Sequence, residues 1–146
     1  MKPETQQKLA EGVRYYSQDP SKRSVTFGGG CYYSGSNAGK PDSEGCMIGR
    51  MLNPQEREYV DYFFKGADSS DVATLMQCAI DGIIDLDHQF LFDEENKYVL
   101  TRFQELHDNN NFWTDKGLSF EGVKCLKGIL DSYPQLDRSL FEEFIN

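Results

Sequence analysis

One short segment of the sequence brings together side chains that could carry out chemistry. His107 is followed directly by Asp108 and then by three asparagines, and Trp113 is the only tryptophan. A histidine oriented by an acid can act as a general base. We therefore take His107, Asp108, Asn110 and Trp113 as candidate ligand-binding residues, although no nucleophile stands at a suitable spacing. The structural alternative is that a cationic His107 stabilises a helix C-terminus while Asp108 and the asparagines complete the last turn.

The four cysteines do not form a metal-binding pattern. They are Cys31, Cys46, Cys78 and Cys125. No C-x-x-C pair occurs and the chain has only two histidines, whereas structural zinc sites draw their ligands in close pairs. Cys78 and Cys125 lie in apolar helical patterns, where cysteine behaves as a small buried hydrophobe. Cys31 and Cys46 flank a loop rich in glycine and serine and could be neighbours across a hairpin, and we expect thiols because no signal peptide precedes them.

Two further segments match known binding loops only in part. Residues 35–41, GSNAGKP, lack one spacer residue of a phosphate-binding loop and place proline where that loop needs serine or threonine. The acidic run 81–95 fails as an EF-hand loop, because a loop starting at Asp85 would have Gln89 and Phe90 at its fifth and sixth positions. Loose cation binding by this run stays open. The sequence predicts no defined metal site and no cofactor.

Charge is distributed unevenly along the 146 residues. The chain has 24 acidic and 15 basic residues, a net charge of −9. Residues 1–50 have a net charge of +2 and residues 51–146 a net charge of −11. A portion of that sign repels phosphate backbones, so we expect no direct nucleic-acid binding. It would attract a partner with a basic surface, although acidic residues can also serve solubility alone.

Helical patterns occupy most of the chain. Their apolar spacing and capping residues predict helices that begin at Pro3, at Asn53, at Ser69 or Ser70, at Asp93, at Ser119 and at Asp137. The helix from Asn53 has a proline at its first position, a glutamate three residues after the cap, a broad aromatic face and a terminator at Gly66. The helix from Asp93 is the clearest, and it ends at a loop over 108–111.

A small β element is predicted near the N-terminus. Alternating and β-branched residues indicate short strands over 23–27, 31–34 and 46–48, separated by glycine-rich turns. Because this element is too small to bury much surface alone, it must pack on the helices. We therefore expect a mainly α (α+β) fold: a single compact domain of five to six helices over 1–146, with a helix and β/loop element in 1–52 and an acidic helical portion in 53–146.

Three short motifs carry a resemblance to a known group of proteins. They are CYY at 31–33, GCMIGRML at 45–52 and FQELHD at 103–108. In this order they resemble a set of small proteins of bacteriophages and bacterial mobile elements, which share C-x-Y, C-x-[IV]-G-x-[LM]-[LI] and L-Q-x-x-H-D; Phe103 replaces the leucine here. That set has no known activity. The resemblance implies a phage or prophage origin and no catalytic residues.

The shared residues look architectural. Cys31, Tyr33, Cys46 and Gly49 are candidate thiol and turn positions, because two cysteines and a tyrosine around tight glycine turns could pin the β element onto the helices. The His-Asp pair would close the central helix.

Three classes of function compete on these observations. The first is a non-enzymatic, acidic protein of phage type that binds and modulates a host protein with a basic surface, in the cytoplasm of the bacterial host. It fits the small size, the surplus of aromatic residues and the absence of a catalytic set. The second is a small-molecule or nucleotide binder, or a small enzyme, that uses the region of His107, Asp108 and Trp113. The third is a redox module that uses Cys31 and Cys46. No stretch approaches 18 apolar residues, so no membrane span is expected.

Overall fold

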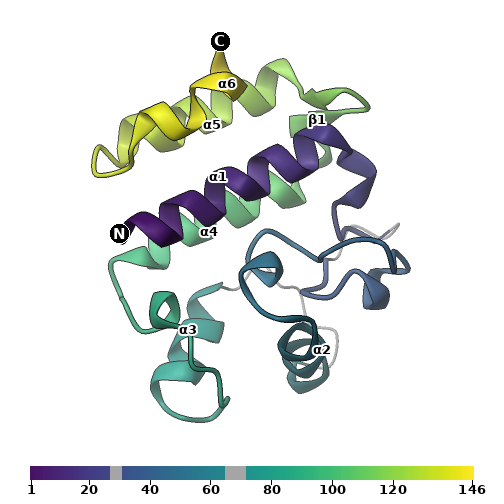
Figure 1. Ribbon diagram of the computed structural model, residues 1–146, viewed down its shortest axis with the longest axis vertical. Helices are drawn as coiled ribbons and strands as arrows, with labels where there is room; N and C mark the ends of the chain where they lie inside the picture. The colour runs from purple at the N-terminus through teal and green to yellow at the C-terminus, as the bar shows by residue number, and fades with distance from the viewer. Residues whose placement is uncertain (27–30, 65–71) are drawn as a thin grey trace.

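The computed structural model describes residues 1–26, 31–64 and 72–146 (Figure 1). The helices are α1 (Pro3–Gln18), α2 (Pro54–Phe63), α3 (Val72–Ile80), α4 (Asn96–Asp108), α5 (Phe120–Ser132) and α6 (Glu142–Ile145). Short 3-10 helices are η1 (Pro20–Lys22), η2 (Ser36–Ala38), η3 (Gly49–Met51), η4 (Gln89–Leu91), η5 (Asn110–Phe112) and η6 (Arg138–Phe141). An antiparallel pair joins β1 (Trp113–Thr114) to β2 (Gly117–Leu118). The expected mainly α class with a small β element is confirmed.

A single core joins the helices. In Figure 1, α1 and α4 run along the middle of the molecule, α5 and α6 lie above them, and α2 and α3 lie below. One connected cluster of buried side chains draws on every helix, with Leu9, Val60, Leu75, Phe103, Leu126 and Ile145 as members from α1 to α6 in order. The ring centres of Phe103 and Phe141, both members of this cluster, lie 5.5 Å apart. Burying each of these rings contributes about 1.5–3 kcal/mol, so the helices hold together as one domain.

Local capping explains where α2 and α5 begin. The Asn53 side chain accepts a hydrogen bond from the Glu56 amide at 2.9 Å, and the Glu56 carboxylate accepts one from the Asn53 amide at 2.8 Å. This is the predicted capping box. Ser119 caps α5 by accepting from the Gly122 amide at 3.1 Å, also as predicted. The predicted cap at Ser69 or Ser70 and the predicted terminator Gly66 lie outside the described residues.

Predicted boundaries differ from the structure at three places. Asp137, predicted to open the last helix, caps the 3-10 helix η6, and α6 begins only at Glu142. α4 begins at Asn96 instead of Asp93, because the Asp93 carbonyl accepts a hydrogen bond from the Asn96 amide and closes a separate turn first. The strands expected within 23–48 reduce, in the described residues, to one bridge between Val25 and Cys31, and residues 46–48 form a turn leading into η3. The sheet lies instead at 113–118, where strands of two residues are too short to show an alternating pattern.

Candidate functional site

His107 lies in α4 with its side chain completely buried. Its Nδ1 is 2.7 Å from Oδ1 of Asp108, and its Nε2 is 3.2 Å from the backbone nitrogen of Ser24. Because a backbone N–H can only donate, Nε2 is the acceptor and the ring proton resides on Nδ1. Neutral His107 therefore has a protein partner at each ring nitrogen.

Asp108 connects this histidine to a second part of the chain. Its Oδ1 also accepts a hydrogen bond from Nε2 of Gln104 at 2.7 Å. The Gln104 side chain in turn accepts from the Ile48 amide at 3.2 Å through Oε1. The His107–Asp108 pair thus ties α4 to the backbone at residues 24 and 48. These contacts join α4 to other parts of the chain, and the histidine in them is neutral, whereas the structural alternative had a cationic one.

His107 contacts both Ser24 and Asp108, but these three residues do not form a nucleophilic triad. The hydrogen bond to the imidazole comes from the Ser24 backbone nitrogen, whereas the Ser24 hydroxyl donates to the Tyr32 carbonyl. A serine nucleophile needs its hydroxyl on the imidazole and access to substrate. Neither condition is met here, because Ser24 is also fully buried.

Trp113 and Asn110 lie near this pair and are joined to it by Arg23. The indole N–H of Trp113 donates to the Leu106 carbonyl at 2.7 Å. The Arg23 guanidinium donates to the His107 carbonyl and to Oδ1 of Asn110, each at 2.7 Å, and lies 5.8 Å from the centre of the Trp113 ring. The structure therefore brings the four predicted ligand-binding residues together, and it uses their polar atoms to fasten the chain to itself.

Burial gives His107 a measurable pH signature. It lowers the pKa of His107 below the ordinary value, against the opposing effect of Asp108. The unfolded chain therefore takes up this proton at a higher pH than the folded chain. The free energy of unfolding is therefore not reduced by this histidine above about pH 6.5. Below that pH it decreases as the pH falls, by at most about 1.4 kcal/mol per pH unit, because the unfolded chain takes up the proton first.

Two measurements check this expectation for His107. Long-range ¹⁵N NMR should show the neutral Nδ1–H tautomer in the folded protein at pH 6.5, and urea unfolding should lose free energy from pH 7.5 to 5.5. A His107→Gln variant cannot gain this proton, so it should lose that part of the slope. A folded-state ring that is mostly imidazolium at pH 6.5 would refute the assignment.

The predicted thiol and turn residues meet beside α4. The sulfur atoms of Cys31 and Cys46 are buried; the first lies 3.6 Å from Nε2 of Gln104, and the second accepts from the Gly49 amide at 3.3 Å. Both residues are thiols in this structure. The Tyr33 carbonyl lies so close to Gly49 that a Cβ there would be 2.1 Å from its oxygen. These four positions therefore belong to the packing of the 31–52 segment.

The other partial motifs lack a binding geometry. Residues 35–41 form η2 and turns, and residues 42–48 after them are not helical, so no helix begins directly after this segment to present its N-terminus to a phosphate. Within the described residues, no group of three or more histidine, cysteine, aspartate or glutamate side chains is arranged to hold a metal ion.

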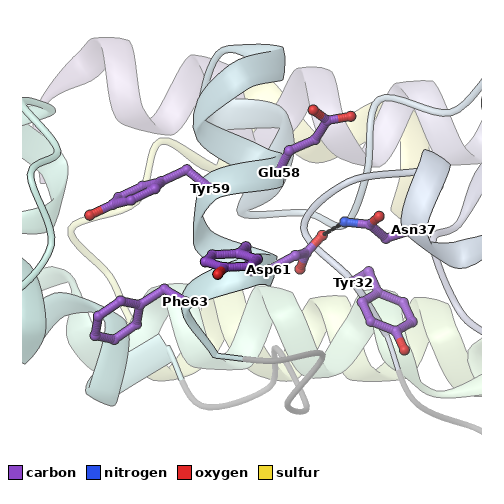
Figure 2. A pocket seen from close by; sticks show the side chains of 7 residues that line it. Tyr32, Asn37, Glu58, Tyr59, Asp61 and Phe63 are labelled. Carbon is purple, nitrogen blue, oxygen red and sulfur yellow. Dashed lines mark hydrogen bonds between the residues drawn. The ribbon is translucent and has the colours of Figure 1, made fainter.

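A hollow of about 950 Å³ lies beside α2 (Figure 2). We call it the α2 hollow; it is lined by Tyr32, Asn37, Glu58, Tyr59, Asp61, Tyr62 and Phe63. In Figure 2, Tyr59 and Phe63 extend from the helix on one side, while Tyr32 lies on the opposite side. Asp61 is directed from the helix toward Asn37, between these two walls.

The aromatic side chains of the α2 hollow face away from the core. Tyr59, Tyr62 and Phe63 follow a helical i, i+3, i+4 spacing and therefore share one face of α2. Their exposed fractions are 41%, 83% and 37%, whereas Val60 and Asp61 are the buried residues of this helix. Large aromatic side chains grouped on an exposed face are typical of a binding surface.

Asp61 holds the loop that forms the opposite wall. Only 4% of the residue is exposed. Its Oδ1 accepts from the Tyr33 amide, and its Oδ2 accepts from the Ser34 amide and the Asn37 side chain, all at 2.9 Å. Burial raises the pKa of Asp61 above its ordinary value, and these three hydrogen bonds offset part of that rise.

The α2 hollow carries negative charge that is not neutralised locally. Glu58 adds a second carboxylate to that of Asp61 and contributes to its raised pKa. In the described part of the chain, neither carboxylate forms an ion pair with a lysine, arginine or histidine. The site thus combines aromatic walls with two carboxylates that lack a cation.

The sequence analysis predicted the aromatic face of this helix but did not identify it as a site. An aromatic stripe on a helix is typical of a core face. A signal was present in the sequence, because Glu58 and Asp61 alternate with the aromatic residues and Val60 is the only aliphatic residue of α2.

None of the helices in the described ranges combines the length and the apolar character needed to cross a membrane. Comparison of the chain with protein-family models, with curated proteins and with solved structures finds no match.

Proposed function

We propose that the protein is a non-enzymatic binding protein that holds a basic segment of another protein against α2. The α2 hollow is the observation that carries this proposal. Tyrosine and phenylalanine are frequent anchors at protein interfaces, because they bury a large apolar area and tyrosine keeps a polar end. A partner that covers Tyr59, Tyr62 and Phe63 would remove from water an apolar surface that folding leaves exposed.

The charge of the molecule favours a basic partner. The hollow belongs to residues 51–146, whose net charge is −11, apart from the wall that Tyr32 and Asn37 provide. Such a field speeds the approach of a positively charged surface and is screened as salt is added. The carboxylates of Glu58 and Asp61, which form no ion pair with another described residue, give the same preference at short range.

The resemblance to phage and mobile-element proteins extends the proposal to the identity of the partner. We propose a protein of the bacterial host, bound in the host cytoplasm and modulated by this binding. The small size of the chain suits such a role, because binding a partner through the α2 hollow requires no catalytic residues.

The two alternative functions gain no supporting geometry. A ligand or substrate at His107 would have to displace Ser24 or Asp108 from a buried ring nitrogen. A redox reaction of Cys31 or Cys46 needs an accessible thiolate, and both residues are buried.

The proposal predicts that loss of Tyr62 weakens partner binding. Tagged wild-type protein, Tyr62→Ala and Tyr98→Ala should be used to retrieve partners from a bacterial lysate at low and high salt. Wild type and Tyr98→Ala should retain the same basic protein at low salt, and Tyr62→Ala should bind it about 5- to 30-fold more weakly, the range for an interface anchor. High salt should weaken binding for all three.

Tyr98 is the matched control because it is a surface tyrosine away from the α2 hollow. It lies on α4 and is 67% exposed. Neither alanine variant should change the free energy of unfolding by more than about 0.5 kcal/mol, since both side chains are on the surface. Equal retention by Tyr62→Ala and wild type, or no retained protein at all, would refute the proposed function.

A further inference from the structure

We infer that the α2 hollow takes an arginine side chain of the partner, with its guanidinium among the tyrosine rings and hydrogen-bonded to Glu58 and Asp61. This inference rests on the proposed function and specifies the chemistry of the anchor. Three features of the described residues carry it: the acceptor capacity of Asp61, the aromatic walls, and an arginine held in a comparable setting elsewhere in the molecule.

The carboxylate of Asp61 has one acceptor position to spare. Each carboxylate oxygen can accept two hydrogen bonds. Among the described residues, Oδ2 accepts two hydrogen bonds, from Ser34 and Asn37, and Oδ1 accepts one, from Tyr33. Asp61 lines the hollow although it is almost fully buried. A cationic donor that enters the hollow would therefore find an acceptor and compensate a buried charge.

The aromatic walls select an organic cation. Tyr32 lines the hollow from the side of the loop (Figure 2). Tyr59 and Tyr62 line it from α2. A cation within about 6 Å of a tyrosine ring centre is attracted by the negative ring face. A guanidinium suits this setting better than an ammonium, because it is planar, is weakly hydrated and presents several N–H groups at once. It can therefore contact a ring face and donate to a carboxylate at the same time.

Elsewhere in the molecule, the arginine Arg50 contacts both a tyrosine ring and a glutamate carboxylate. The guanidinium of Arg50 lies 4.8 Å from the centre of the Tyr15 ring, while its Nε donates to Glu44 at 2.8 Å. One tyrosine face and one glutamate thus suffice to position an arginine within this fold. The α2 hollow offers the same two groups, with further tyrosines and a second carboxylate, and no internal arginine is paired with them in the described ranges.

NMR titration with short peptides tests the inference directly. The probes are acetyl-Gly-Xaa-Gly-amide peptides in which Xaa is arginine, lysine or citrulline, the last being an uncharged analogue of arginine. The arginine peptide should shift the ring signals of Tyr59 and Tyr62 and the side-chain amide of Asn37, and it should leave Tyr98 unmoved. The lysine peptide should bind about two- to fivefold more weakly than the arginine peptide. The citrulline peptide should bind more weakly than the arginine peptide by about tenfold or a larger factor.

Surface variants assign the contacts without disturbing the fold. Tyr62→Ala and Glu58→Gln should each weaken the arginine peptide about two- to fivefold. Tyr98→Ala and Glu94→Gln remove the same groups from exposed positions outside the hollow and should leave its affinity unchanged. Asp61 is left intact in this series, because it also holds the loop.

The outcomes separate this inference from the proposed function. Equal binding of the arginine and citrulline peptides, tighter binding of lysine than arginine, or shifts at Tyr98 as large as those at Tyr62 would overturn the arginine anchor. If the arginine peptide fails to bind while lysate capture still depends on Tyr62, the anchor is refuted and the proposed function stands. If capture does not depend on Tyr62, the proposed function itself is refuted.

Discussion

Replacing Gly45 with alanine is expected to destabilise the protein by about 4 kcal/mol or more, a large share of the stability of a domain of this size. Gly45 has φ +99°, which an alanine adopts only with strain, and an added Cβ would lie 1.8 Å from the Tyr33 carbonyl oxygen. The backbone cannot easily move away, because the Gly45 carbonyl accepts from the buried Tyr16 hydroxyl and its amide donates to Ser43.

Gly39→Ala is the matched control for this steric effect. Gly39 has φ +75°, but nothing lies within 4 Å of an added Cβ, so its replacement should cost only the conformational strain, about 1–2 kcal/mol. Thermal unfolding should show a midpoint about 10 °C lower for Gly45→Ala and only a few degrees lower for Gly39→Ala. Similar midpoints for the two variants would show that the close approach of Gly45 to Tyr33 does not constrain the fold.

Replacing Asp61 with alanine is expected to cost about 3–5 kcal/mol. The change removes the carboxylate that accepts from three N–H donors, among them the buried backbone amides of Tyr33 and Ser34. Each buried donor without a partner costs about 1–3 kcal/mol, and removal of a desolvated charge offsets part of that total. The loop wall of the α2 hollow should loosen as a result.

Asn37→Ala separates the backbone hydrogen bonds from the side-chain one. It removes a single exposed donor to the same carboxylate, so it should cost about 1 kcal/mol. Urea unfolding gives both free energies, and hydrogen exchange follows the amides of Tyr33 and Ser34. These amides should lose protection in Asp61→Ala and keep it in Asn37→Ala. If both variants were equally stable, Asp61 would not be what holds the loop.

Local sequence signals predicted where α2 and α5 begin, but they did not predict the strands. The capping box at Asn53 and the cap at Ser119 depend on residues within one turn, and both are present as predicted. The start of α4 was predicted three residues early because Asp93 is a good cap by type, yet its carbonyl closes a preceding turn. The sheet at 113–118 was missed because two residues per strand leave no periodic pattern to detect.

The environment of His107 could not be predicted from its neighbours in sequence. The segment placed His107 beside Asp108, and that contact exists in the structure. Its burial, however, depends on Ser24 and on Tyr16, whose ring lies 4.8 Å from the imidazole. These residues are more than 80 positions away in the chain, so only the tertiary fold decides whether this histidine meets solvent.

The α2 hollow escaped prediction for a similar reason. Tyr59, Tyr62 and Phe63 have the spacing of a core face. In the structure α2 is anchored by Asp61 on the Tyr33–Ser34 backbone and by Arg57, which donates to the Gly49 carbonyl at 2.7 Å. These polar contacts turn the aromatic face outward, and a long-range polar anchor of this kind leaves no periodic signal in the sequence.

Site-specific photocrosslinking tests the central claim most directly, namely that the aromatic face of α2 contacts a partner protein. A photoreactive benzoylphenylalanine should be placed at position 62, and in a separate protein at position 98, and each should be irradiated in bacterial cells. We expect position 62 to yield one defined adduct with a basic protein and position 98 to yield none, since Tyr62 and Tyr98 are both exposed but only Tyr62 lines the α2 hollow. An adduct at position 98 with no adduct at position 62 would contradict the account.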